Sequence, residues 1–158
     1  MVGADELRAA MRRFPAGVAV VTVALDDERF GITVASLVSL SLEPPLVGIS
    51  IGLQSSIHEP LRRARRFAVN VLAGDQGGLA QHFARSGLPP LVAWTGIALR
   101  ESALAEPLLE GALAWLECAT QAEYEAGDHT IFVGSVESVE LGRDEDGLAY
   151  ARSDYHSV

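Results

Sequence analysis

The chain contains no lysine, a single cysteine and no long apolar run, and all 12 of its basic residues are arginine. The absence of lysine excludes a Walker lysine, a Schiff-base lysine and a Ser–Lys dyad, because each of them requires an amine. The single Cys118 excludes an intramolecular disulfide and a cysteine-based zinc site, and it fits a reducing cytoplasm. No apolar run approaches the ~20 residues of a membrane span. Residues 1–14 carry too many charges for a signal peptide.

The net charge, the spacing of the histidines and the missing motifs exclude further classes of function. The net charge of −9 argues against binding to nucleic acid or to an anionic membrane, since both need a large basic surface. The four histidines are scattered without the spacing of metal ligands, so we expect no metal site. No nucleophile elbow, Rossmann glycine fingerprint or P-loop is present. A redox cofactor would therefore be held without a Rossmann motif.

The pattern of β-branched residues and turns predicts one mainly β domain spanning residues 1–158. The expected strands are 17–24, 31–42, 46–51, 67–72, 116–126 and 130–141, and the expected short helices are 5–14, 55–66 and 76–85. Strand 116–126 alternates, which places Glu117, Gln121, Glu123 and Glu125 on a solvent-exposed face. About six or seven strands with short helices favour a closed antiparallel barrel over a doubly wound sheet.

Residues 31–42 form an unusually hydroxyl-rich strand, with Thr33, Ser36, Ser39 and Ser41 among apolar neighbours. Serine is a weak strand former, so several serines in one apolar run need an explanation. The hydroxyls could bond neighbouring backbone groups. Alternatively, a polar ligand such as a flavin ring edge lies along the strand, where Ala35 and Ser36 let it approach the backbone.

Gln54, Ser55 and Ser56 follow an expected strand and precede an expected helix. Free amide groups and the helix dipole make such a position suitable for an anion. The spacing from Ser56 to Glu59 also matches a capping box, in which Ser56 serves only as the N-cap. The two roles do not exclude one another.

Two further segments combine polar and aromatic residues. His129 follows Gly127 and Asp128 at the start of an expected strand, where loops often carry function, although the same residues also describe an ordinary turn with a surface histidine. The tail, residues 152–158, contains Tyr155 and His156 and is of the kind that often frays.

Several of these segments together resemble the flavin reductase-like, FMN-binding split-barrel family, which includes the reductase components of two-component flavin-dependent monooxygenases. The matching segments occur in the family's order and cover nearly the whole chain: 14–22, 31–47, 55–56, 66–84, 111–118, 127–137 and 152–158. One such segment would be weak evidence, but seven in register are strong evidence. Two positions depart from the family pattern, Ala16 in place of a more usual threonine and Ala151 in place of a common aromatic.

The resemblance implies a fold and a set of site residues. The fold is an antiparallel, Greek-key-like split β-barrel with a few short helices, assembled as a homodimer with flavin near the subunit interface. Thr33, Val34, Ala35 and Ser36 would contact the isoalloxazine and ribityl chain, with Ser39 further along the same strand. Gln54, Ser55 and Ser56 would lie near the phosphate. His129 would line the nicotinamide pocket, and Tyr155 and His156 would cover the flavin.

The function implied is transfer of hydride from NADH or NADPH to FMN or FAD, with the reduced flavin supplied to a partner monooxygenase. Such a step depends on stacking and alignment more than on an acid–base pair, which agrees with the lack of a catalytic constellation. One alternative is a non-catalytic flavoprotein for storage, sensing or electron transfer, because fold alone does not decide function. Another is a related barrel that uses a flavin-like cofactor such as deazaflavin.

Overall fold

The computed structural model describes all residues from 1 to 158. The four helices are α1 (Ala4–Met11), α2 (His58–Ala64), α3 (Gly77–Ala84) and α4 (Pro90–Trp94). The first six strands are β1 (Ala16–Gly17), β2 (Ala19–Leu25), β3 (Glu28–Val34), β4 (Val38–Leu42), β5 (Pro45–Gly52) and β6 (Arg66–Val71). The others are β7 (Leu99–Arg100), β8 (Leu108–Leu109), β9 (Ala114–Ala126), β10 (His129–Leu141), β11 (Leu148–Ala151) and β12 (Asp154–Ser157). None of the helices has the length and apolarity that a membrane crossing requires.

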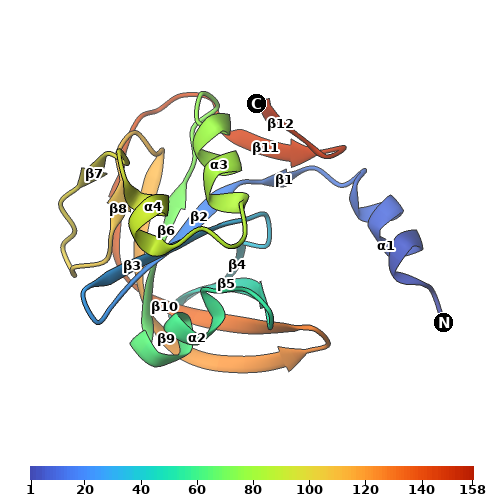
Figure 1. Ribbon diagram of the computed structural model, residues 1–158, viewed down its shortest axis with the longest axis horizontal. Helices are drawn as coiled ribbons and strands as arrows, with labels where there is room; N and C mark the ends of the chain where they lie inside the picture. Colours follow the sequence, from blue (N-terminus) through green and yellow to red (C-terminus); the bar gives the residue numbers. More distant parts are fainter.

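Seven strands form one antiparallel sheet in the order β3-β2-β6-β9-β10-β5-β4 (Figure 1). Its two edge strands, β3 and β4, are consecutive in the chain and are separated only by residues 35–37. Three residues cannot span a flat sheet of seven strands, since neighbouring strands lie about 4.8 Å apart. The sheet therefore curls until its edges approach. The predicted mainly β, antiparallel barrel with a few short helices is confirmed.

The prediction of one continuous strand over residues 31–42 was wrong, because the chain leaves β3 after Val34 and starts β4 at Val38. Ser36 fixes this crossing: its hydroxyl donates to the carbonyl of Ser50 on β5 at 3.1 Å and accepts from the Ser50 amide at 3.0 Å. The break has a long-range cause, since the chain must pass here from one edge of the sheet to the other. The propensity to form a strand is the same for the residues on both sides of the break, so it could not predict where the strand ends.

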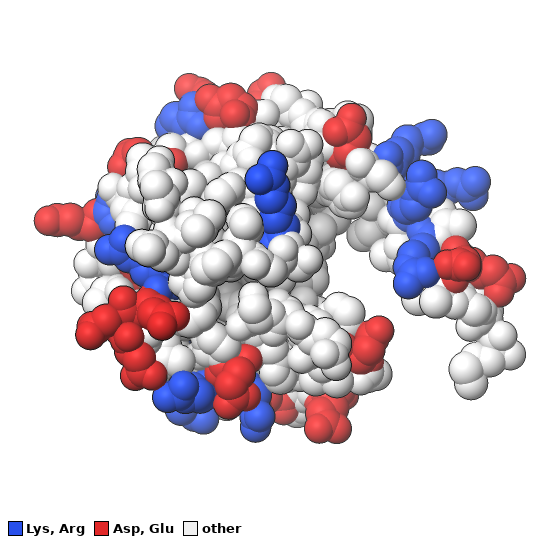
Figure 2. All heavy atoms as spheres, viewed as in Figure 1, with Lys and Arg blue, Asp and Glu red and all other residues white.

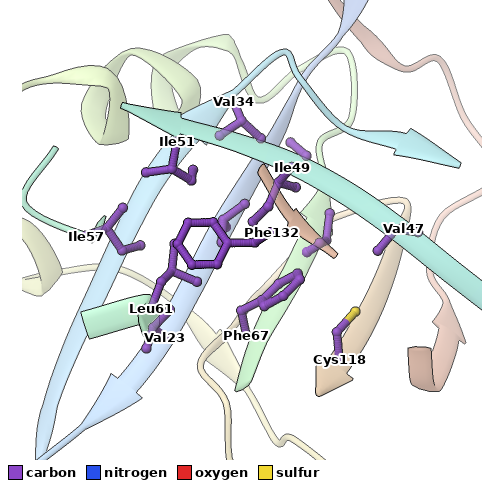
Figure 3. Packing of buried hydrophobic residues seen from close by; sticks show 13 residues of the cluster. Val23, Val34, Val47, Ile49, Ile51, Ile57, Leu61, Phe67, Cys118 and Phe132 are labelled. Carbon is purple, nitrogen blue, oxygen red and sulfur yellow. The ribbon is translucent and has the colours of Figure 1, made fainter. Parts of the chain in front are cut away.

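The main core lies inside the curled sheet, where β-branched and aromatic side chains from most strands meet (Figure 3). Phe67, Phe132, Ile49 and Leu61 are almost completely inaccessible to solvent. A second apolar cluster lies beneath α3 and includes Leu72, Ala80 and Phe83. Cys118 is buried in the main core, and burial raises the pKa of its thiol to about 12. The side chain therefore remains a neutral thiol.

The helices differ from their predicted boundaries at both ends. α2 begins at His58 with Ile57 as its N-cap and with no side-chain cap, so the predicted capping box from Ser56 to Glu59 was wrong. Consecutive turns, closed by bonds from Ser55 N to the Gly52 carbonyl and from His58 N to the Ser55 carbonyl, delay the start of the helix. α1 ends at Met11 rather than Phe14, buries none of its residues and projects from the body (Figure 1).

Glu117 on β9 was expected on a solvent-exposed face, but it is only 2% exposed. The Ser102 hydroxyl donates to its carboxylate, because the segment carrying β7 and β8 covers this face of β9. The alternation of apolar and polar residues along β9 does not indicate that another segment covers this face. The more distal Gln121, Glu123 and Glu125 are exposed, as expected.

The C-terminal tail is ordered as a strand. β12 pairs with β11, which also pairs with β1, and the three strands form a small separate sheet (Figure 1). Tyr150 and Tyr155 face one another across this hairpin with ring centroids 5.0 Å apart. The tail is therefore tied down by backbone pairing.

Candidate functional site

The candidate site lies where β5 ends and β10 begins. His129 opposes Gly52 in the β5–β10 register, and Ile131 opposes Ser50, the residue held by Ser36. His129 Nε2 lies 3.8 Å from the position that a Cβ on Gly52 would occupy. The absence of a side chain at Gly52 thus lets the imidazole lie over the end of β5. Ser36, through its bonds to Ser50, and His129 are brought to the same end of β5 from positions far apart in the sequence.

His129 has a carboxylate partner that the sequence analysis missed. Its Nδ1 atom lies 2.7 Å from Asp128 Oδ1, and both side chains are exposed. The hydrogen bond from His129 lowers the pKa of Asp128. When Nδ1 carries the proton donated to Asp128, Nε2 of the neutral ring is left as an acceptor. Adjacent residues in a turn rarely face one another, so the pair could not be read from sequence.

A second histidine supports the same strand. His58 at the start of α2 lies with its Nε2 atom 2.8 Å from the Thr130 hydroxyl, and its ring meets Phe132 edge-on. It therefore holds α2 against β10 next to His129. This side chain is half-buried and serves the packing around the site.

Residues 53–57 form the turn that follows β5. The Leu53 amide donates to the Asp128 carbonyl, which joins this turn to the loop before His129. The Ser55 hydroxyl accepts from the Ile57 amide at 3.4 Å, whereas Gln54 and Ser56 are exposed. The Ser56 side chain is free of hydrogen bonds within the chain and lines a pocket with Arg29 and Arg85. The turn thus leaves polar groups available beside basic residues.

The hydroxyls of β3 are partly occupied by backbone. Thr33 donates to the Ala80 carbonyl of α3 at 2.6 Å, and Ser36 makes its two bonds with Ser50. Val34 points into the core, whereas Ala35 is exposed. The first of the two interpretations of this strand, hydroxyls bonded to backbone, therefore describes Thr33 and Ser36. A ligand at this position would meet Ala35 and backbone groups rather than free hydroxyls.

The tail approaches the same flank through α3. Tyr155 lies 3.8 Å from the position of a Cβ on Gly77, which is one helical turn before Ala80, the partner of Thr33. Tyr155 is half-buried, and burial raises the pKa of its phenol. His156 points the other way and is exposed, with Nε2 3.2 Å from the Ala151 carbonyl. The structure therefore brings Tyr155 against α3, the helix whose Ala80 carbonyl Thr33 bonds.

Ser39 lies apart from these residues. It pairs with Val47 on β5, five positions before Gly52, which opposes His129. At about 3.3 Å per residue, this separation is roughly 17 Å along the strand. The structure places Ser36, through its bonds to Ser50, close to the turn and to His129, whereas Ser39 lies further along the strand.

Comparison with known proteins gives the site its context. A family model described as "Flavin reductase like domain" matches residues 11–158. The chain is 39% identical over 154 residues to the reductase component of 4-hydroxyphenylacetate 3-monooxygenase from Thermus thermophilus, with 98% of this chain and 96% of that protein covered. It is 44% identical over 137 residues to an NADH-dependent FAD reductase from Streptomyces globisporus, with 83% and 72% covered.

Solved structures agree with this result. The flavin reductase component of a bacterial two-component tryptophan halogenase superposes with a TM-score of 0.92 at 34% identity, over 99% of this chain and 98% of that one. The whole described fold is thus shared, including the turn after β5 and the tail strands.

Proposed function

This chain belongs to the flavin reductase-like domain family, and from that premise we propose that it is an NADH-dependent flavin reductase that transfers hydride to FMN or FAD. The observation that carries the proposal is the match of the family model to residues 11–158 together with relatives of nearly the same length. Of the two nicotinamide donors expected, NADH is the one that the name of a relative states.

The chemistry is the transfer of hydride from nicotinamide C4 to flavin N5. The work left to the chain is to bind both rings and to hold them in contact with water excluded, because alignment dominates such a step. His129 over Gly52 offers a polar group with one nitrogen already fixed by Asp128. No proton needs to be abstracted by this side chain.

The geometry fits a flavin along β3 and the turn after β5. Thr33, Val34, Ala35 and Ser36 would meet the ring system through their backbone, since their side chains are occupied, buried or small. Gln54, Ser55 and Ser56 would bind the phosphate. Tyr155 would close the site from the tail, and we propose no role for His156, which points the other way. We propose no role for Ser39, which lies further along the sheet.

Steady-state oxidation of NADH tests the proposal directly. The purified protein should oxidise NADH only when FMN or FAD is added or already bound, and NADPH should be a poorer donor. A flavoprotein used only for storage or electron transfer would bind flavin without turnover, and that result would sink the proposal. The absorbance spectrum of the protein as isolated distinguishes flavin from deazaflavin.

A homodimer is the proposed assembly. α1 is attached only at its C-terminal end and exposes Leu7 and Met11, Phe14 after it is also exposed, and the edge strand β4 exposes Leu40 and Leu42. Apolar side chains gathered on a projecting helix and on a sheet edge mark an interaction surface. Light scattering should give twice the mass of the chain, and the double substitution Leu7→Glu and Met11→Glu should shift it to the monomer. A monomeric unsubstituted protein would contradict this proposal.

We further propose that the reduced flavin serves a flavin-dependent monooxygenase component, as the name of the Thermus thermophilus relative states for that protein. We propose a cytoplasmic location, which the buried, reduced Cys118 and the use of NADH support. Adding an oxygenase component should raise product formation in proportion to the NADH oxidised.

Replacement of both Ser55 and Ser56 by alanine tests the phosphate site. These hydroxyls lie in the turn after β5, and Ser56 lines a pocket that Arg29 and Arg85 also line. Hydrogen bonds to a charged group are worth about 1.5–3 kcal/mol, so FMN binding should weaken by roughly 10- to 100-fold. Riboflavin lacks the phosphate and should lose far less. Equal losses for the two ligands, measured by fluorescence titration, would show that the serines only shape the turn.

His129→Ala tests whether this residue positions NADH. The variant should raise KM for NADH by about tenfold, the loss of one hydrogen bond, and leave kcat and flavin affinity nearly unchanged. Asp128→Asn is the matched control, since it keeps the ring and weakens only its orientation, and should raise KM less. If His129 were instead a general acid or base, its removal would lower kcat at saturating NADH. A fall in kcat with unchanged KM would therefore defeat the positioning role.

A further inference from the structure

His58 is the first residue of α2 and takes no part in the proposed hydride transfer. Its Nε2 atom lies 2.8 Å from Thr130 Oγ1, and Thr130 follows His129 directly on β10. Thr130 is only 5% exposed, and His58 is the single hydrogen-bond partner of its hydroxyl within the chain. A buried hydroxyl without a partner is costly, so this bond holds the two side chains together.

The bond closes the segment that carries the proposed phosphate site. The chain leaves β10 where the Leu53 amide donates to the Asp128 carbonyl at 2.9 Å, and it returns to β10 through the His58 side chain. Between these two contacts lies the turn with both serines of the proposed phosphate site. Residues 53–58 are therefore fixed to residues 128–130 at both ends. Such closure limits the conformations that the turn can adopt before a ligand binds.

The other contacts of α2 hold the helix without fixing the turn against β10. Ile57 and Leu61 are buried in the main core, and apolar contacts of this kind have no preferred direction. At the lower edge of the molecule, where Figure 1 places α2 and β9, acidic and basic side chains lie side by side (Figure 2). Arg62 pairs there with Glu123 of β9 at 3.3 Å, but Arg62 is 53% exposed and such pairs contribute little. The directional contact between α2 and β10 is therefore the bond from His58.

The packing around His58 keeps its imidazole in position for this bond. The ring meets Phe132 edge-on with centroids 5.6 Å apart, and Phe132 is fully buried two residues after Thr130 on β10. Thr130 itself opposes Ile51 of β5, so its hydroxyl is fixed by the sheet. A displacement of the turn is consequently passed through His58 to Thr130, whose neighbour in the chain is His129.

We propose that His58 is a positioning residue that couples the binding of flavin to the binding of NADH. The inference rests on the proposed function, because it takes the flavin phosphate at the turn and the nicotinamide at His129. A phosphate bound in the turn fixes His58 and, through Thr130, the start of β10. NADH bound at His129 fixes the turn in return, since coupling between two sites is reciprocal. The binding of one ligand thereby prepares the site of the other.

Four substitutions remove or keep the hydrogen bond. Thr130→Val preserves the shape of the side chain without the hydroxyl, and His58→Phe keeps a ring against Phe132 without the nitrogen. Each should raise the Kd for FMN and the KM for NADH by about 2- to 10-fold, the range for one lost hydrogen bond, with kcat nearly unchanged. The Kd for riboflavin, which lacks the phosphate, should change far less. Thr130→Ser and His58→Gln retain a hydroxyl and a side-chain amide, and should restore most of both values.

Titration of FMN with and without saturating NAD⁺ measures the coupling directly. In the unsubstituted protein NAD⁺ should lower the Kd for FMN by about fivefold or more, and in Thr130→Val and His58→Phe this ratio should fall toward one. Thr22→Val is the matched control, because Thr22 is another buried threonine and its hydroxyl donates to the Pro107 carbonyl at 2.5 Å, away from the turn. It should lower the melting temperature and leave both Kd values, the KM and the ratio unchanged.

The same measurements define the results that would overturn the proposal. A lowered melting temperature in Thr130→Val and His58→Phe with unchanged FMN and NADH values would mean that His58 only stabilises the fold. Equal weakening of FMN and riboflavin, or a NAD⁺ ratio that survives the loss of the bond, would overturn it as well. Absence of NADH oxidation in the unsubstituted protein would count against the reductase function, and the FMN and riboflavin titrations would still decide whether His58 positions the turn.

Discussion

Phe67→Ala is expected to cost about 3–5 kcal/mol of unfolding free energy, the range for removal of a buried aromatic ring. Phe67 lies on β6, is fully buried and belongs to the core inside the curled sheet (Figure 3). Its ring reaches across to β10, where a Cβ on Gly134 would lie 2.6 Å from Phe67 Cζ. The ring thus fills the space that Gly134 leaves open, and neighbouring side chains cannot collapse into it easily. Urea denaturation followed by tryptophan fluorescence measures the loss.

Phe67→Leu is the matched control, because it keeps most of the apolar volume and should cost far less. The loss in the alanine variant is a large fraction of the 5–15 kcal/mol that holds a domain of this size. β10 also carries His129, so a loosened core should disturb the site before the fold is lost. A cost below about 1 kcal/mol for Phe67→Ala would contradict close packing at this position.

Sequence patterns predicted the strands well where propensity and burial act in the same direction. Val20, Val21 and Val23 lie in one β-branched run and are buried in β2, as such a run indicates. The break at Ser36 and the buried Glu117 could not be predicted in this way. Both depend on residues distant in sequence: Ser50 holds the crossing between sheet edges, and Ser102 and its neighbours cover β9. The local sequence pattern carries no information about which distant segments pack on a strand.

The residues of the candidate site also divide into those that could be predicted from the sequence and those that only the folded chain brings together. His129 and Ser55 stand in segments that resemble family motifs, so the resemblance pointed to them. Arg29 and Arg85 belong to segments without a motif, and only the packing of α3 on β3 brings them into one pocket with Ser56. Their signal would have been charge without a partner, which is a property of the folded chain. The Asp128–His129 pair depends likewise on the conformation of one turn.

Arg66 and Glu106 form a charged contact on the covered face of β6 and β9, and the burial of this face could not be predicted from the local sequence pattern. Arg66 Nε donates to Glu106 Oε1 at 2.9 Å, and Nη1 donates to Glu137 Oε1 at 2.6 Å. Glu106 is 6% exposed, and its second carboxylate oxygen has no partner. Burial raises the pKa of Glu106, with a further contribution from Glu117, although Arg66 acts in the opposite direction. Glu106 therefore takes up a proton more readily in the folded chain than a free glutamate does.

Arg66→Met should lower the unfolding free energy by about 3 kcal/mol at about pH 8. This value is the lower end of the range for a broken buried ion pair, because the Arg66 side chain is 34% exposed. Since the folded pKa of Glu106 is raised, its contribution to stability is complete below the ordinary value for glutamate and is lost as pH rises through the folded pKa. Without Arg66 this loss becomes larger, because the arginine no longer favours the charged form of Glu106, and the deficit of the variant should shrink as pH falls and Glu106 takes up a proton. Adding Glu106→Gln to Arg66→Met should restore much of the stability at about pH 8, because no buried charge is left unpaired. Urea denaturation of the three proteins across this pH range measures both effects. A deficit that is independent of pH and not relieved by Glu106→Gln would mean that Arg66 stabilises the fold by packing of its stem rather than by its charge.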